Sequence, residues 1–160
     1  MKNIKYDCHI TITSRHTYTS AYNVKRAQAE LKSFLGALRY KFDGKHFWCM
    51  GVGHDGNRIH YHILYQGGKP SKKWIKRKMF ARNGCYQVKV EKFHPDQIQY
   101  LIRQNAARVP HPSDVPNFSA DGAYGLHIHR IGASRGFLPP PPRAESPLKG
   151  TFLRVEVIDA

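Results

Sequence analysis

Acidic residues are scarce in this chain of 160 residues. Aspartate and glutamate together number 11, against 26 lysines and arginines, so the formal net charge is +15 and the pI is near 10.0. This charge goes well beyond what solubility requires, and it favours a polyanionic partner, with nucleic acid as the first candidate. A membrane surface is the rival, but the sequence has neither a long apolar run nor a basic amphipathic helix with a continuous apolar face.

Three other features are missing. The first ten residues, MKNIKYDCHI, lack the apolar segment of a signal peptide, so we expect a cytoplasmic protein. Cysteine is limited to Cys8, Cys49 and Cys85, an odd number without metal-type spacing, and we expect buried, reduced thiols. No Gly-x-x-x-x-Gly-Lys motif is present, so the chain carries no P-loop ATPase of its own.

The length and the hydrophobic share of 41% suit one domain with a real core. We place this domain at residues 1–137. Residues 138–160 form a separate proline-rich segment and C-terminal tail, in which Pro139–Pro142 is a stiff polyproline stretch and Phe152–Ile158 has the pattern of an edge strand.

Hydrophobic periodicity predicts an α+β fold: an antiparallel sheet of about five strands with flanking helices. Ser20 and Ser71 are expected to cap the first two helices at their N-termini. The predicted strands cover residues 6–13, 45–52, 58–65, 85–90 and 124–131, and the predicted helices cover residues 22–40, residues 72–82 and a third segment that begins at residue 95.

His60 and His62 share one face of the strand predicted over 58–65, because side chains alternate along a strand. Their β-carbons would lie about 6–7 Å apart, so both rings can reach one divalent ion if a third ligand arrives from a neighbouring element. The alternative is a pair of exposed or hydrogen-bonded histidines, since His-x-His arises by chance in a chain with ten histidines.

The turn before this strand decides what lies beside the two histidines. A three-residue loop would bring His54 to the histidine side of the neighbouring strand, whereas a four-residue loop would bring Gly51 and Gly53 there. The sequence leaves both registers open.

Tyr100 falls on the polar face of the third helix, with Arg103 one turn later and Gln104 at the i+4 position. Ile98 and Leu101 are on the opposite, apolar face. The simpler interpretation is a partly buried surface tyrosine. A cation and an amide beside the hydroxyl nevertheless make Tyr100 a candidate nucleophile.

Together, the His-hydrophobic-His strand and the helical tyrosine about forty residues later resemble the HUH superfamily of single-strand DNA endonucleases. The closest likeness is to small single-tyrosine rolling-circle replication initiators of phages and plasmids, over roughly residues 3–137. The resemblance implies the HUH nuclease or ferredoxin-like core, with Mn²⁺ or Mg²⁺ held by His60 and His62. It implies that Tyr100 forms a 5′-phosphotyrosine and frees a 3′-OH that primes replication, while Arg103 stabilises the developing charge.

The sequence departs from that family in two places. Arg103 stands where replication initiators commonly have lysine, and the neighbouring strand offers no acidic third ligand. Small single-tyrosine transposases use a glutamine at the i+4 position as a ligand, so Gln104 is the expected third ligand here, with His54 as the alternative. A transposase of that kind is therefore the second functional interpretation.

The expected partner is single-stranded DNA at an origin or hairpin. Whether a host helicase is a further partner is left open by the sequence. Most of the DNA contacts are expected on elements other than the histidine strand. His9, on the polar face of the first strand, is a structural or DNA-contacting residue. A second His-x-His pair, His127 and His129, competes for the metal. The Gly-Ala-Ser-Arg-Gly sequence after it resembles the end of the last core strand of replication initiators, which implies that Ser134 and Arg135 contact phosphate. The expected DNA-binding residues are His9, Lys72, Lys73, Lys76, Arg77 and Arg135.

Two other functional classes compete with the nuclease. His9 and Thr11 form a single His-x-Thr motif, which resembles 2H phosphoesterases, but those enzymes need two copies. A basic single-strand nucleic-acid binder without catalytic activity would use the same histidines and tyrosine for stacking and hydrogen bonding. Dependence of activity on a metal separates the binder from the nuclease.

Overall fold

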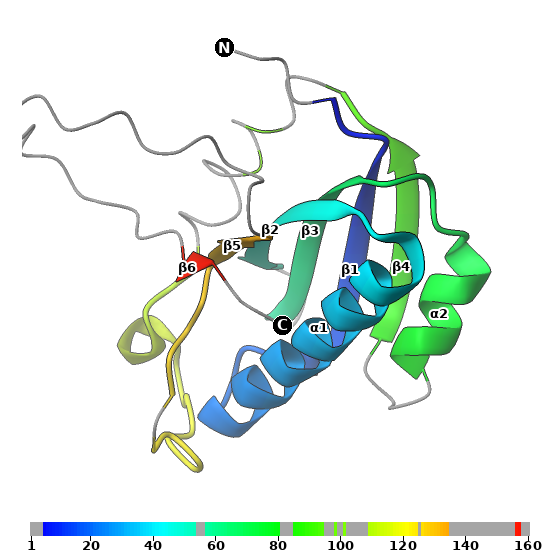
Figure 1. The fold of residues 1–160 in the computed structure, drawn as a ribbon. Helices are drawn as coiled ribbons and strands as arrows, with labels where there is room; N and C mark the ends of the chain where they lie inside the picture. The colour runs from blue at the N-terminus through cyan, green and yellow to red at the C-terminus, as the bar shows by residue number, and fades with distance from the viewer. Residues whose placement is uncertain are drawn as a thin grey trace, which may run out of the picture.

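The computed structural model describes residues 5–53, 57–80, 85–94, 98, 101, 109–124, 126–134 and 156–157. These residues form an α+β fold in which a five-stranded antiparallel sheet carries two helices (Figure 1). No helix among them is long and apolar enough to cross a membrane. The elements in chain order are β1 (Cys8–Thr17), α1 (Ala21–Phe42), β2 (Lys45–Val52), β3 (Arg58–Gln66), α2 (Lys72–Phe80), β4 (Cys85–Lys92), the 3₁₀ turn η2 (Pro112–Asp114), β5 (Ile131–Ala133) and β6 (Glu156–Val157).

The strands lie in the order β4-β1-β3-β2-β5-β6. Neighbours from β4 to β5 are antiparallel, and the short β6 pairs in parallel with β5 at the edge. The β1-α1-β2-β3-α2-β4 sequence with β1 and β3 in the centre is the ferredoxin-like arrangement. The predicted α+β class is confirmed, and part of the predicted tail strand is present as β6.

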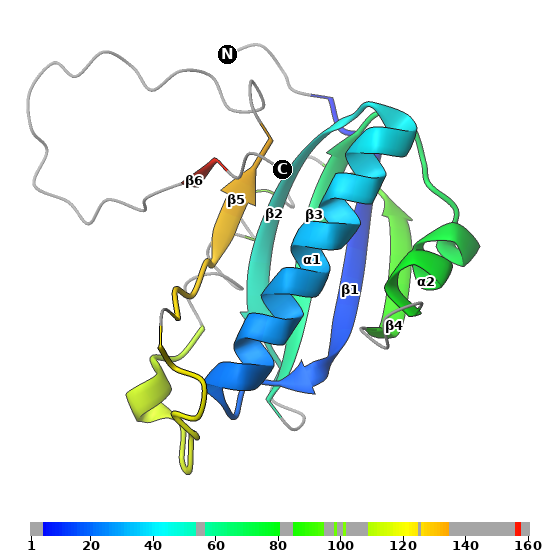
Figure 2. The same cartoon turned by 60° about the horizontal axis from the view of Figure 1, so that its bottom comes forward.

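Both helices cover the same face of the sheet (Figure 2). The side chain of Ser20 accepts a hydrogen bond from Asn23 N at 3.1 Å, and that of Ser71 accepts one from Trp74 N at 3.1 Å, so both predicted N-caps are confirmed. Trp74 packs on Phe34 and Phe42, with ring centroids 6.1 and 5.0 Å apart, which fixes α2 beside α1. The core under α1 includes Ile10, Ile12, Tyr61 and Ile63.

The strand predicted over 124–131 is wrong for most of its length, because within the described residues only its last residue, Ile131, lies in a strand. The sequence alternates as a strand does, but the backbone here forms hydrogen bonds with a side chain instead of with a neighbouring strand. In the orientation that satisfies both of its amide atoms, Gln28 of α1 donates to His127 O at 3.0 Å and accepts from His129 N at 2.8 Å. The backbone at 127–129 is therefore bound to a helix rather than to the sheet.

Cys8 and Cys49 are buried and form no disulfide, as the sequence predicts. Burial raises the pKa of Cys8 to about 11 and that of Cys49 to about 12, so both remain protonated thiols at neutral pH.

Candidate active site on the histidine face

The sheet face opposite α1 and α2 carries the predicted metal ligands, and we call it the histidine face. Cross-strand partners in an antiparallel pair share a face. His62 of β3 lies between Thr11 of β1 and Cys49 of β2. His60 lies between Thr13 and Gly51. Both histidines thus lie on an interior strand of the sheet, because β3 has β1 on one side and β2 on the other.

The turn between β2 and β3 follows the four-residue alternative. Gly53 N donates to Arg58 O at 2.9 Å, and Val52 pairs with Ile59, so Gly51 and Gly53 are on the histidine side. His54 lies outside the described residues, and its role as a ligand stays a prediction.

Gly51 makes room for the His60 ring. A β-carbon at position 51 would lie 2.4 Å from His60 Nε2 and 3.0 Å from its two neighbouring ring carbons. Because real side chains do not approach that closely, any other residue at position 51 would displace the ring. The glycine therefore lets His60 extend over β2.

A third histidine joins the pair. His9 Nε2 lies 3.1 Å from His62 Nδ1, and the two rings stack with centroids 5.2 Å apart. The rings of His60 and His62 are perpendicular, with centroids 5.1 Å apart. Thr11 Oγ1 is 3.4 Å from His62 Nδ1 and 3.5 Å from His9 Nε2. Three imidazoles thus stand in the order His60, His62, His9 across the face.

Burial favours the neutral form of the His62 and His9 rings. It lowers the pKa of His62 to about 3, and the nearby His60 and His9 add to the effect. Burial also lowers the pKa of His9. A neutral imidazole retains the lone pair that a metal ion requires. If His62 Nδ1–H donates to His9 Nε2, the lone pair of the His62 ring lies on its own Nε2, the nitrogen that the predicted metal site would use.

The described part of the chain contains no group of three or more His, Cys, Asp or Glu side chains arranged to hold a metal ion. Imidazole nitrogens from His60 and His62 suit Mn²⁺ as part of a mixed ligand set, but they do not form a complete site. Both candidates for the third ligand, Gln104 and His54, lie outside the described residues.

The tyrosine segment is described at two positions. Tyr100 and Arg103, like Gln104, lie outside the described residues. Ile98 and Leu101 are helical. Leu101 is 2% exposed and belongs to the apolar cluster of Phe47 and Leu64 on the histidine face. Its carbonyl oxygen accepts from Cys49 Sγ at 3.6 Å, and Cys49 is the cross-strand partner of His62. The residue that follows Tyr100 in the sequence therefore packs beside the histidine pair.

Four other described tyrosines, two in the core under α1 and two on α1 itself, are unsuited to attack at this face. The hydroxyls of Tyr61 and Tyr65 are buried without a partner. Burial raises the pKa of Tyr61 and raises that of Tyr65 to about 12. Tyr22 and Tyr40 are exposed, but both belong to α1, behind the sheet.

The predicted DNA-binding residues are divided between the two faces. Lys72, Lys73, Lys76 and Arg77 belong to α2, which shares the α1 side of the sheet. His9 is on the histidine face but is only 6% exposed, so its geometry favours orienting His62 over contacting DNA. Arg135 lies outside the described residues.

Ser134 does not have the free hydroxyl that we expected for phosphate contact. Its Oγ accepts from His46 N at 2.9 Å and lies 3.3 Å from His46 O. This side chain is 9% exposed and closes the end of the β2–β5 pair. Its hydrogen bonds serve the sheet.

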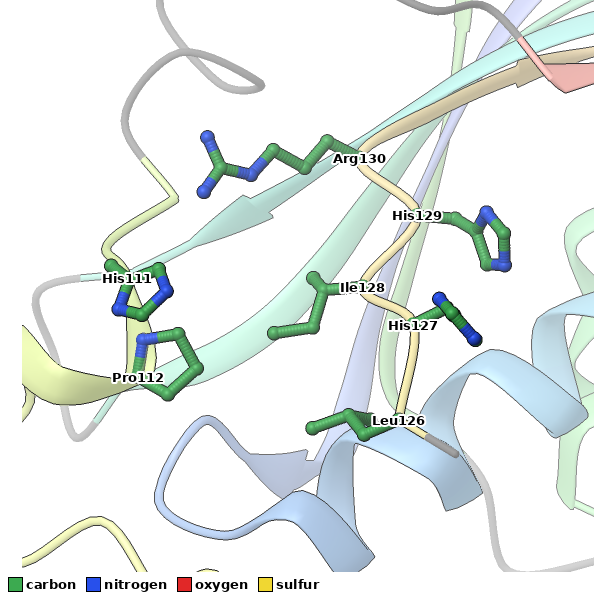
Figure 3. A pocket seen from close by; sticks show the side chains of 7 residues that line it. All are labelled: His111, Pro112, Leu126, His127, Ile128, His129 and Arg130. Carbon is green, nitrogen blue, oxygen red and sulfur yellow. The ribbon is translucent and has the colours of Figure 1, made fainter. Parts of the chain in front are cut away.

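The second histidine pair borders a separate pocket of about 600 Å³ between the 126–130 segment and η2 (Figure 3). Ile128 and Arg130 extend toward His111, whereas His127 and His129 extend from the other side of the segment. These two histidines are held on an irregular segment rather than on a strand, so they lack the rigid support that β3 gives the first pair.

Sequence reasoning missed the contribution of His9 to the site. Its signal was present: His9 and Thr11 alternate on the polar side of the first strand. What the sequence did not reveal was that β1 and β3 are neighbours, which brings His9 within hydrogen-bonding distance of His62.

Comparisons with protein-family models, characterised proteins and solved structures found no match to this chain.

Proposed function

We propose that the chain is a metal-dependent HUH-type endonuclease that nicks and joins single-stranded DNA at an origin or hairpin to initiate rolling-circle replication. The observation that carries the proposal is the joint position of the His60–His62 pair and of Leu101 on the histidine face. In this proposal the enzyme acts in the cytoplasm on phage or plasmid DNA, and a host helicase supplies the unwinding.

The proposed roles follow from the chemistry of each group. His60 and His62, with Gln104 or His54, would hold Mn²⁺ or Mg²⁺, which supplies positive charge to the scissile phosphate. The Tyr100 hydroxyl gives up its proton to solvent as its oxygen attacks phosphorus, a phosphotyrosine bond forms with the 5′ side, and the bond from phosphorus to the 3′ oxygen breaks. That oxygen takes up a proton and leaves as the 3′-OH. Arg103 balances the charge that develops on the phosphoryl oxygens.

Tyrosine needs help to act as a nucleophile, because its ordinary pKa is about 10. The stacked His9–His62 pair is neutral and can hold His62 in one tautomer without adding a competing positive charge. Gly51, which has no β-carbon, leaves room for the His60 ring over β2. These two supports concern described residues and can be tested separately from the nucleophile.

The decisive experiment replaces Tyr100 by phenylalanine. We expect Tyr100→Phe to eliminate the covalent protein–DNA adduct formed with Mn²⁺ and single-stranded oligonucleotides, because the substitution removes the attacking oxygen and little else. A denaturing gel with labelled DNA measures the adduct, and Tyr40→Phe is the matched control. An undiminished adduct in Tyr100→Phe would assign the attack to another residue, which peptide mapping would identify.

A single-tyrosine transposase remains the alternative within the same superfamily, and Gln104 favours it. Strand transfer between two cleaved hairpin ends, rather than closure of a nicked circle, would select the transposase. The alternative from another class is a basic single-strand binder without catalytic activity. This alternative predicts that the protein binds DNA but forms no covalent protein–DNA adduct, whichever metal ion is added.

A further inference from the structure

A basic groove runs between the C-terminal end of α1 and α2, on the sheet face opposite the histidines. It consists of two adjoining pockets of about 470 and 450 Å³ that share Lys41, Trp74 and Arg77. Tyr40 and Lys78 line the first pocket, and Lys73 lines the second. We call these six residues the α1–α2 groove.

The groove is strongly cationic. Its two pockets are lined by four lysine and arginine residues and by no acidic residue, and none of these four cations forms an ion pair with a described carboxylate. Lys41 Nζ is held 5.7 Å from the centroid of the Trp74 ring, a cation–π distance. The cation is thus positioned by an aromatic ring rather than by an opposite charge.

Helix stability does not account for this charge. α2 has no acidic residue in its first turn and begins with Lys72 and Lys73. Cations at that end oppose the helix dipole, whose positive pole lies at the N-terminus. Only Arg77 and Lys78, in the last turn, are placed favourably for the helix. A negatively charged partner explains the cations at both ends.

Tyr40 adds a flat stacking surface at the rim of the groove. It is 94% exposed, whereas Trp74 is 7% exposed and belongs to the core. An exposed aromatic ring beside a row of cations is how proteins bind single-stranded nucleic acid, with the ring under a base and the cations along the backbone. Duplex DNA, whose bases are already stacked, would leave Tyr40 unused.

We propose that the α1–α2 groove is a second binding site for single-stranded DNA, separate from the histidine face. This proposal rests on DNA being the partner in the proposed function, but it does not depend on the cleavage chemistry. The edge strand β4 lies between the two sites, because α2 packs against one of its faces and its other face is part of the histidine face. On that second face Lys89 is exposed and forms an ion pair with Glu91 at 2.7 Å. A long strand can pass around this edge and occupy both sites.

The test measures DNA binding with EDTA present, so that cleavage does not contribute. Calorimetry with an oligonucleotide of about 8 nucleotides, within the usual range of single-strand site sizes, should show two bound per wild-type protein and one per Lys41→Glu/Arg77→Glu variant. For an oligonucleotide of about 40 nucleotides the double variant should bind about tenfold more weakly. The slope of log affinity against log salt should fall by about 1.4, for two lost phosphate contacts.

The stacking part of the proposal is tested at Tyr40. Tyr40→Ala should weaken binding of the long oligonucleotide about tenfold, and Tyr40→Phe should restore it, because phenylalanine still stacks. The exposed ring makes no core contacts that the truncation would remove.

The matched control is Arg26→Glu/Lys32→Glu, which changes the net charge equally at two exposed positions of α1 outside the groove. This control protein should still bind two of the short oligonucleotides, as the wild type does. Equal losses in the control and the groove variant would overturn the proposal, as would unchanged binding in the groove variant. If the groove variant lost binding to anionic lipid vesicles but kept its DNA affinity, the proposal would also be overturned, and the groove would be assigned to a membrane surface. If the protein formed no covalent adduct with DNA, the proposed cleavage chemistry would fail, but the number of oligonucleotides bound in EDTA would still test the groove.

Discussion

At the scale of single residues, His46 shows how burial governs a titratable group outside the candidate site. It is 5% exposed, and its Nδ1 atom is buried without a partner. Burial lowers its pKa from 6.5 to about 4, with a further contribution from Arg39. The folded protein therefore keeps this ring neutral at a pH where the unfolded chain would protonate it.

This difference predicts acid sensitivity. Because the folded-state pKa is the lower one, the stabilising contribution is complete above pH 6.5 and is lost as the pH falls toward 4. We expect His46 to account for a loss of about 2–3 kcal/mol in the free energy of unfolding between pH 7 and pH 4.5. Urea unfolding of the wild type and of His46→Leu at the two pH values measures it. Equal pH dependence in both proteins would contradict the assignment to His46, since His9 and His62 titrate in both.

At the scale of elements, two glycines that bracket the end of α1 have opposite requirements. A β-carbon on Gly36, inside the helix, would meet nothing within 4 Å. On Gly44, after the αL cap at Asp43, it would lie 2.1 Å from Tyr65 Oη and 2.3 Å from Gln66 O. The first position can accept a side chain, and the second is closed by β3.

We therefore expect Gly36→Ala to stabilise the protein by about 1 kcal/mol, the difference in helix propensity. Gly44→Ala should destabilise it by about 3 kcal/mol, because backbone and a buried ring must move. Thermal and urea unfolding of the pair measures both effects. A neutral Gly44→Ala would show that the α1–β2 turn adapts more easily than its packing indicates.

Most elements were predictable because their information is local. Alternation in residues 45–52 and 58–65 and the Ser20 and Ser71 caps specify strands and helices without reference to the rest of the chain. The failure at 124–131 has a non-local cause, since Gln28, about a hundred positions away, binds that backbone. The same limit applied to the site: both registers of the β2–β3 turn fitted the sequence, and the packing of Gly51 against His60 belongs to only one of them.

At the scale of the whole molecule, the sheet lies between the candidate catalytic residues and the basic residues of α2. The histidines and Leu101 are on one face, whereas the basic residues of α2 are on the other. The net charge of +15 should supply most of the affinity for DNA. Catalysis and binding should therefore be separable by substitution.

We expect His60→Ala and His62→Ala each to reduce Mn²⁺-dependent cleavage by at least about 100-fold while changing DNA affinity by less than about threefold. Nicking assays and fluorescence anisotropy measure the two quantities on the same protein samples. His127→Ala and His129→Ala are the matched controls and should cleave normally. Full activity in the first two variants, or calorimetric loss of metal in the controls, would move the ion to the second pair.

The positions of the two tryptophans have a spectroscopic consequence. Trp48, 1% exposed, packs edge-to-face on Tyr61 in the core under α1, with ring centroids 5.8 Å apart. Trp74 lines the α1–α2 groove beneath Lys41. The indole emission of a Trp48→Phe protein therefore originates beside the groove, and that of Trp74→Phe originates in the core. The chain thus contains its own fluorescent reporters, one for occupancy of the groove and one for integrity of the fold, without any added label.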